Sequence, residues 1–356
     1  MQLLNSIDNQ LLNALQDIVS KVQIKSDFCI THPNYKPLEL PAEAVIRFQQ
    51  LPLELKNKYL SLQLRSFLYS IYYNGVKATS DQDSDTSPQL ENNTVMGLNP
   101  EFYDRLHESN SGEGYFDPGW CVIRQESDGS LAVQKNNLTL HIERDCHLQS
   151  LEQSAAVGDK VAIRTPRNRV EEDFYIAIGN AGLVNYISSS QNYEIVHIYF
   201  NFTPEGAVAI MNSLTQQLNQ NKIPFTFKVL YNPADYGRYD SGFLYFERRD
   251  YQVVHNIIQS VYPENKLYFK PEIPLFTKLL APGLALVEAP NFINEDFGSS
   301  RFQIVANGLL KARRKGNESP DSRLKSIINQ FSILGIDLKY PYLNPNSKDI
   351  SRQLTY

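Results

Sequence analysis

Apolar residues follow two different spacings along the chain, and the change of spacing separates helical ends from a strand-rich middle. Residues 1–24 and 52–73 repeat apolar side chains every three or four positions, which predicts two amphipathic helices. The stretch between them, 32–41, is expected to be extended. Two more helices are predicted near the C-terminus, one after Ser299 and one that begins at Ser319 and ends at Gly335.

The middle of the chain alternates apolar and polar residues, the period of strands with one buried face. Strands are expected at residues 138–142, 160–164, 174–178, 196–201, 225–231, 242–248 and 267–269. Helices predicted from Thr203 and from about Asp250 to Val261 separate the last four strands into the order β-α-β-β-α-β. We therefore predict an α+β fold, with a helical N-terminal region, a mainly antiparallel sheet domain and C-terminal helices. If the helices cover one side of the sheet, its other face is free for a cleft.

A polar, acidic stretch separates these regions. Residues 79–93 contain almost no apolar side chain, which is typical of a mobile connection. We predict an N-terminal helical region (1–78), an acidic flexible linker (79–111) and an α+β domain (112–356). Three aspartates of the linker alternate as in a calcium loop, but the glycine and the distal glutamate of that loop are missing, so no metal site is predicted.

Charge and composition exclude several functional classes. The 356 residues carry a net charge of −5 and have a pI near 5.8, so no nucleic-acid partner is expected. Acidic residues interrupt the first helix, so neither a signal peptide nor a membrane span is expected. The three cysteines lack Cys-x-x-Cys spacing, which favours free thiols in a reducing compartment. We expect a cytoplasmic protein with no membrane partner.

The strand at 225–231 places a charge in the most hydrophobic alternating run of the chain. Lys228 points away from the aromatic face formed by its neighbours. A partly desolvated lysine is available as a base, and Arg238 and Asp240 follow after a turn. The alternative is that Lys228 faces solvent and that Arg238 and Asp240 pair with each other in a loop.

Two further groups carry candidate chemistry. His141 lies on the polar face of a predicted strand and is the best general acid by position, with a structural role as the alternative. Arg164, Arg167 and Arg169 surround Pro166 at the end of another strand. Such a cluster suits phosphate or carboxylate, because guanidinium groups bind oxyanions with two hydrogen bonds. The alternative is a solvated basic loop that offsets the acidic residues after it.

Several segments, in order, resemble the Hop A-type type III effector family. The resemblance covers Gly112 to Asn344 and rests on GEGYFDPGW, VAIRTPRN with FYIAIGNAG, IYFNFTPEGA, IPFTFKVLYNP, RYDSGFLYFER, PLFTKLLAPGLALVE, FGSSRFQIVANGLL and GIDLKYPYLNP. The N-terminal helices and the acidic linker lie outside it. Relatives in lanthipeptide and thioamitide-type peptide-modification clusters act beside a kinase as lyases for phosphorylated Ser or Thr.

The resemblance implies an activity and a set of residues. The chain would be a phosphothreonine lyase-like carbon–oxygen lyase that dehydrates a phosphorylated precursor peptide, works with a kinase-like partner and requires no metal or organic cofactor. Related phosphothreonine lyases use a Lys base, a His acid and Arg or Lys phosphate ligands. Positions that match the family's polar motifs are Lys228, Arg164, Arg238, Asp240, Thr277, Lys278 and Arg301.

Three further residues complete the candidate site: Arg167 and, on the polar face of strand 196–201 and at its end, Tyr199 and Asn201. No histidine matches the acid, so His141 is the candidate for that role. We expect Arg164, Lys278 and Arg301 to converge near Lys228 on one sheet face. The alternative function is a non-catalytic, effector-like module that binds a partner protein in the same cleft.

Overall fold

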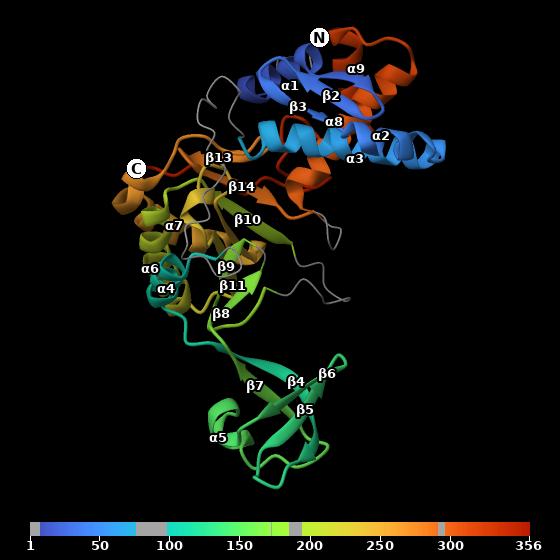
Figure 1. The fold of residues 1–356 in the computed structure, drawn as a ribbon. Coiled ribbons are helices and arrows are strands. Elements are labelled where there is room, and N and C mark those ends of the chain that lie inside the picture. The colour runs from blue at the N-terminus through green and yellow to red at the C-terminus, as the bar shows by residue number, and fades with distance from the viewer. Residues whose placement is uncertain (1–7, 76–97, 172, 185–193, 291–295) are drawn as a thin grey trace.

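A computed structural model describes residues 8–75, 98–171, 173–184, 194–290 and 296–356. It contains the predicted α+β architecture, arranged around three sheets (Figure 1). The chain begins in a helical unit, passes through a small sheet, crosses the main sheet and returns to the helical unit. Among the described residues, no helix is long and apolar enough to cross a membrane.

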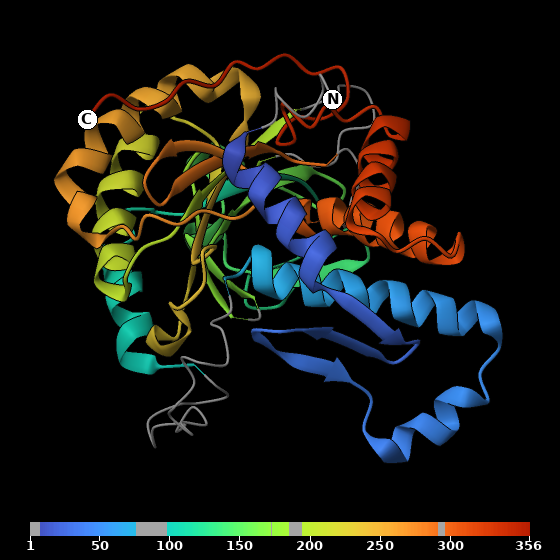
Figure 2. The same ribbon diagram turned by 90° about the horizontal axis from the view of Figure 1, so that it is seen from above.

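Helices from both ends of the chain form a single unit. It comprises α1 (Asn9–Lys21), α2 (Ala42–Gln49), α3 (Leu53–Tyr72), α8 (Phe297–Arg314) and α9 (Pro320–Ile333). Figure 2 shows α1 and α3 beside the C-terminal helices, and the buried apolar faces of these four helices form one core. Arg323 of α9 closes this contact by donating hydrogen bonds of 2.7 Å to the carbonyls of Val19 and Val22. The N-terminal helices therefore have no hydrophobic core of their own and share one with α8 and α9.

The first predicted helix is shorter than expected. It ends at Lys21 because the chain then pairs as an antiparallel meander of β1 (Gln23–Ser26), β2 (Cys29–His32) and β3 (Tyr35–Glu39). These strands are too short for the alternation to be visible in the sequence, and α2 was not predicted either. The second predicted helix corresponds to α3. Helix α9 ends at Ile333, just before the predicted stop at Gly335, whose φ of +68° suits glycine.

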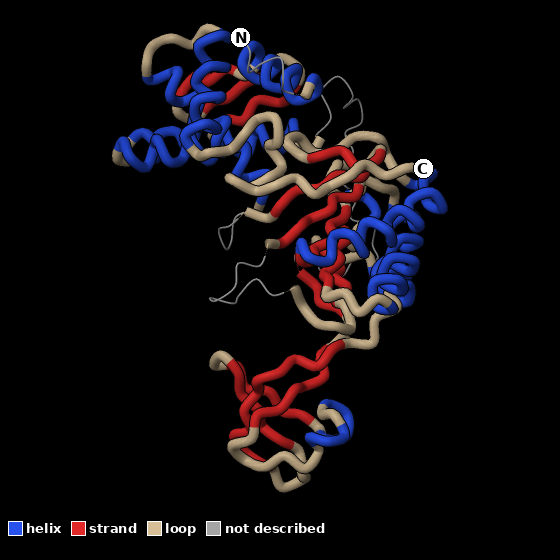
Figure 3. Tube along the Cα trace, turned by 180° about the vertical axis from the view of Figure 1, so that it is seen from behind, coloured by secondary structure: helices blue, strands red, loops and turns tan. Residues whose placement is uncertain are grey.

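A seven-stranded antiparallel sheet forms the centre of the molecule, in the order β13-β14-β10-β12-β11-β9-β8. Its strands are β8 (Asn168–Glu171), β9 (Phe174–Ile178), β10 (Ile195–Phe200), β11 (Phe225–Leu230), β12 (Gly242–Glu247), β13 (Lys278–Ala281) and β14 (Leu284–Glu288). The helices α6 (Pro204–Gln220) and α7 (Tyr251–Asn265) cover one face, as Figure 3 shows from behind. Thr203 caps α6 with a hydrogen bond from the amide of Gly206, as the sequence predicts.

The predicted β-α-β-β-α-β unit is present, but its last strand was misplaced. Residues 266–268 form a short 3-10 helix after α7, and only Phe269 makes an isolated bridge, to Phe202. The fourth strand of the unit is β14, which adds beside β10 to give the split order β14-β10-β12-β11.

A four-stranded sheet projects from the main body (Figure 1). It is built from β4 (Tyr115–Gln125), β5 (Leu131–Lys135), β6 (Leu138–Ile142) and β7 (Lys160–Thr165), with the short helices α5 (Arg144–His147) and Ser150–Glu152 in the β6–β7 connection. Trp120, Val122, Val133 and Ile163 lie in a core of its own. We name this part the β4–β7 module.

The predicted linker is in part structured. Residues 76–97, including the aspartate-rich stretch, lie outside the described residues, but Pro100–Ser109 form α4, which packs against α6. Asn99 caps α4 by accepting a hydrogen bond from the amide of Phe102. The prediction of a flexible linker is therefore wrong for this helix, whose apolar residues Phe102 and Leu106 are buried.

Candidate functional site

The face of the main sheet opposite α6 and α7 borders a cavity of about 810 Å³. Strand alternation sends Phe227, Leu244 and Ile198 into the core beneath α6 and α7. The residues between them, Lys228, Tyr245 and Tyr199, face the cavity. The end of α3 and the start of α8 close its inner side. The free sheet face that the sequence predicted is thus confirmed.

Strand pairing arranges the cavity-facing side chains in rows across the sheet. One row joins Arg169, Ile176, Lys228, Phe243 and Tyr199, each opposite the next on adjacent strands. With about 4.8 Å between strands, Lys228 lies about 10 Å from Arg169 and about 10 Å from Tyr199 along this row. A second row joins Ile178, Thr226, Tyr245 and His197.

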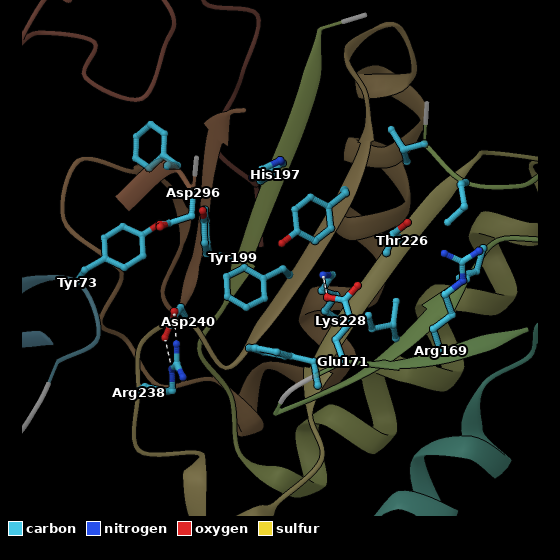
Figure 4. A pocket seen from close by; sticks show the side chains of 18 of the residues that line it. Tyr73, Arg169, Glu171, His197, Tyr199, Thr226, Lys228, Arg238, Asp240 and Asp296 are labelled. Carbon is cyan, nitrogen blue, oxygen red and sulfur yellow. Dashed lines mark hydrogen bonds and ion pairs between the residues drawn. The ribbon is translucent and has the colours of Figure 1, made fainter. Parts of the chain in front are cut away.

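The cationic part of the cavity consists of Lys228 and Arg169 (Figure 4). The Lys228 Nζ atom lies 2.5 Å from a carboxylate oxygen of Glu171, which reaches it from the edge strand β8. Lys228 Nζ also lies 5.7 Å from the centre of the Tyr245 ring. The Arg169 guanidinium donates a hydrogen bond of 3.1 Å to the Tyr115 hydroxyl. Arg169 and Lys228 thus stand on the same sheet face, two strands apart.

A second ion pair borders the cavity near α3. Arg238 donates two hydrogen bonds to Asp240, of 2.6 and 2.8 Å, and the Asp240 side chain is 1% exposed. Burial raises the pKa of Asp240, and the hydrogen bonds from Arg238 oppose that rise. This local pairing is the alternative that the sequence left open for these two residues.

Neutral polar groups also line the cavity. His197 is buried, and burial together with the charge of Lys228 lowers the pKa of its imidazole to about 3. Its ring packs edge-on against Tyr245, with ring centres 4.3 Å apart. Burial raises the pKa values of Tyr73 and Tyr199 well above that of free tyrosine. At neutral pH the imidazole and both phenols are therefore uncharged.

The predicted acid and two predicted phosphate ligands lie outside this cavity. His141 is on β6, with a side chain 60% exposed and 3.5 Å from Glu126. Arg164 is on β7 and donates to the Glu113 carbonyl. Arg167 donates to three main-chain carbonyls, those of residues 107, 110 and 112, so its guanidinium fixes the chain between α4 and β4. His141 and Arg164 both belong to the β4–β7 module, which projects away from the main sheet that contains Lys228 (Figure 1).

The other predicted ligands are also elsewhere. Thr277 and Lys278 border a different, smaller cavity of about 290 Å³, where Lys278 pairs with Asp349 at 2.6 Å. Arg301 is buried in α8 and donates to the carbonyls of Pro341 and Leu343. Asn201 is buried and donates to the Glu272 carbonyl. The predicted convergence of Arg164, Lys278 and Arg301 near Lys228 is wrong, because their cations hold the chain together at three separate places.

Of the predicted residues, Lys228, Arg238, Asp240 and Tyr199 line the cavity, and so does Arg169 of the predicted arginine cluster. The sequence did not single out Glu171, Thr226, Tyr245 or His197 for the site. Thr226 and His197 lie on the polar faces of predicted strands, whereas β8, which holds Arg169 and Glu171, was not predicted as a strand. What the pattern lacked was the order of the strands, which brings β8 and β10 to the two sides of β11 and β12.

The model of the HopA1 effector protein family matches residues 165–343, half of the chain. The chain belongs to the HopA1 effector protein family. The match begins at the last residue of β7 and includes the whole main sheet, so the β4–β7 module lies almost entirely before it. The resemblance inferred from the sequence motifs is thereby confirmed as family membership.

Two solved structures are similar to this chain. One is the effector protein from Pseudomonas syringae pv. tomato strain DC3000, with 17% identity, a TM-score of 0.43, and coverage of 79% of this chain and 90% of that chain. The other is the effector protein from Pseudomonas syringae pv. syringae strain 61, with 16% identity, a TM-score of 0.44, and coverage of 86% and 100%. No curated protein matches the sequence.

Proposed function

We propose that this HopA1-family protein is a lyase that eliminates phosphate from phosphorylated Ser or Thr in a peptide and leaves a dehydroamino acid. One observation carries the proposal: Lys228 and Arg169 stand on the same open sheet face, two strands apart, in a cavity large enough for a peptide segment. Elimination requires a base at the α-carbon and cations around the departing phosphate. The substrate would be a precursor peptide that a kinase-like partner has phosphorylated.

The reaction assigns a separate task to each cation. Lys228, as a free amine, takes the proton from the α-carbon while the double bond forms between the α- and β-carbons. The β-carbon–oxygen bond then breaks, and its electron pair leaves with the phosphate. Arg169 binds the phosphate oxygens with its guanidinium, which matches oxyanion geometry. The reaction consumes no water and involves no oxidation.

The ion pair with Glu171 adds a condition. An ammonium has no lone pair, so Lys228 must part from Glu171 and lose a proton before it accepts another. Glu171 is suited to exchange because its side chain is 58% exposed and comes from an edge strand. An arriving phosphate repels the carboxylate and takes its place beside the cations.

The same ion pair favours one rival, a non-catalytic protein that binds a phosphorylated or acidic partner. In that case Lys228 stays an ammonium and serves as an anion ligand beside Arg169. The two functions differ in a single product. Mass spectrometry of a phosphothreonine peptide incubated with the protein detects the loss of phosphoric acid that only the lyase produces.

Substitutions at Lys228 distinguish the two roles. Lys228→Ala should lower turnover by about 10²- to 10⁴-fold, the contribution of a positioned acid or base. Lys228→Arg should be almost as inactive, because arginine keeps the charge but does not deprotonate. If Lys228→Arg retains near-normal turnover, Lys228 is a phosphate ligand and another group is the base.

Arginine substitutions test the phosphate assignment with a matched control. Arg169→Ala should weaken both peptide binding and turnover, since a guanidinium on the phosphate acts in the ground state and the transition state. Arg164→Ala removes an equal charge from β7, outside the cavity, and should leave both unchanged. Equal losses in the two variants would show that Arg169 acts only through overall charge.

A further inference from the structure

The cavity extends well beyond the two cations. From Lys228, the row of paired residues continues through Phe243 to Tyr199, about 10 Å farther across the sheet. Extended peptide spans about 3.3 Å per residue, so this inner half has room for about three residues. A phosphorylated side chain held by Arg169 and Lys228 does not reach it.

Two buried polar atoms of the inner half have no hydrogen-bond partner among the described residues. They are the hydroxyl of Tyr73, a residue 1% exposed, and the Nε2 atom of His197, a residue 8% exposed. The Tyr73 hydroxyl lies close enough to Tyr199 for the two phenols to affect each other, but their geometry falls short of a hydrogen bond. A buried polar atom without a partner costs free energy, so such atoms in a cavity wall point to a ligand that satisfies them.

Packing holds the Tyr73 ring in place. Tyr73 follows the last residue of α3 and stacks on Tyr69, with ring centres 4.7 Å apart. The start of α8 lies directly against both rings. The approach is so close that a Cβ atom added at Gly298 would lie 2.8 Å from Tyr73 Cζ. The hydroxyl is thus fixed before any ligand arrives, which favours binding because no side-chain freedom is lost.

We propose that Tyr73 and His197 bind the main chain of the residues next to the phosphorylated one, so that the substrate is an extended phosphopeptide and not a free phosphoamino acid. This inference rests on the proposed function for the position of the phosphate. A peptide group supplies an N–H donor and a carbonyl acceptor. A phenol can pair with either, and a neutral imidazole Nε2 pairs with one of them in each tautomer. Tyr245 and Phe243 provide a flat apolar surface between the two halves.

The experiment compares two probes that bind but do not react. Both contain a phosphonate in which a methylene replaces the bridging oxygen of phosphothreonine, so elimination cannot occur. One is the single residue, acetylated and amidated, and the other carries three alanines on each side. Calorimetry of the intact protein should show tighter binding of the longer probe.

Removal of the Tyr73 hydroxyl is the decisive variant. Tyr73→Phe should weaken the longer probe by about 2- to 13-fold, the worth of one hydrogen bond, and leave the short probe unchanged. Its melting temperature should stay nearly unchanged, because the contact of the Tyr73 hydroxyl with Tyr199 falls short of a hydrogen bond. His197→Phe, measured at pH 7.5, should weaken the longer probe in the same way.

Tyr236→Phe is the matched control. Its buried hydroxyl donates a 2.6 Å hydrogen bond to the Leu230 carbonyl on the helix-covered side of the sheet. This variant should lower the melting temperature and leave the binding of both probes unchanged. The inference is overturned if Tyr73→Phe binds both probes like the unmodified protein, or if its affinity for both probes falls by the same factor.

The outcome is separable from that of the proposed function. If the longer probe binds more tightly through Tyr73 but phosphopeptides are never dehydrated, the inference that Tyr73 binds the peptide main chain stands and the lyase proposal fails. If dehydration occurs but the probes bind equally well, the inference alone fails. If neither probe binds, the phosphate position is wrong and both fail.

Discussion

Two ion pairs border the same cavity, and they differ in nearly every property except distance. Lys228 and Glu171 lie 2.5 Å apart, with side chains 22% and 58% exposed. Arg238 and Asp240 lie 2.6 Å apart, but the Asp240 side chain is 1% exposed and accepts two hydrogen bonds. Figure 4 shows the two pairs at separate places in the cavity wall.

The difference follows from where each carboxylate originates. Glu171 belongs to the edge strand β8 and reaches Lys228 on β11 across the single strand, β9, that lies between them. Asp240 lies two residues from Arg238 in a turn whose Tyr239 amide donates to the Asn74 carbonyl at the end of α3. An exposed pair contributes little and exchanges readily, whereas a half-made buried pair is costly. We propose that the first pair exchanges its carboxylate for an anion and that the second is structural.

Truncation of the buried carboxylate should have the largest effect on this comparison. Asp240→Ala should lower the free energy of unfolding by about 3 kcal/mol or more, because the Arg238 guanidinium is left mostly buried without its partner. Urea denaturation measures this loss. Glu171→Ala should stay within about 1 kcal/mol. Equal losses for the two variants would contradict the division into structural and exchangeable pairs.

The neutral group between the pairs should make stability depend on pH. Because the pKa of folded His197 is about 3, below the value of about 6.5 in an unfolded chain, the unfolded state binds the extra proton first. The contribution is complete above pH 6.5 and is lost as the pH falls from 6.5 toward 3. We expect a decrease of a few kcal/mol over this range.

His197→Phe should flatten that decrease, measured as the free energy of unfolding at a series of pH values. His141→Phe is the control, since the His141 side chain is 60% exposed and lies on the β4–β7 module. A slope that stays the same in His197→Phe would show that other groups account for the acid sensitivity.

The smallest expected effect concerns the exchangeable pair. Glu171→Gln should tighten the binding of inorganic phosphate by about two- to fivefold, because phosphate no longer has to displace a carboxylate from Lys228. Glu194→Gln is closely matched, as the Glu194 side chain is 57% exposed and lies 2.6 Å from Arg248 outside the cavity. Isothermal titration of both variants tests this, and a gain in Glu194→Gln of the same size would reduce the effect to net charge.

Alternation in the sequence predicted which face of a strand each side chain occupies, but it did not predict the order of the strands in the sheet. The strands that contain Lys228, Tyr199 and Tyr245 were predicted with nearly their observed bounds. The fourth strand of the unit was misplaced because Leu267–Phe269 is short and apolar, and such a run does not distinguish a strand from a turn beneath a helix. The arginine run near Pro166 was predicted as one cluster, yet its three members point to three different environments.

The sequence by itself determined the two-faced strands, the cap of α6 and the resemblance to the HopA1 effector protein family, and it offered the pairing of Arg238 with Asp240 as one of two alternatives. Each of these depends on residues close together in the chain or on a motif within one segment. Only the tertiary structure decided that Glu171 meets Lys228 across 57 residues, that Tyr73 closes the cavity, and that Arg301 and Lys278 bind the chain elsewhere. The physical reason is that strand order and helix docking arise from packing among distant segments, which no local pattern records.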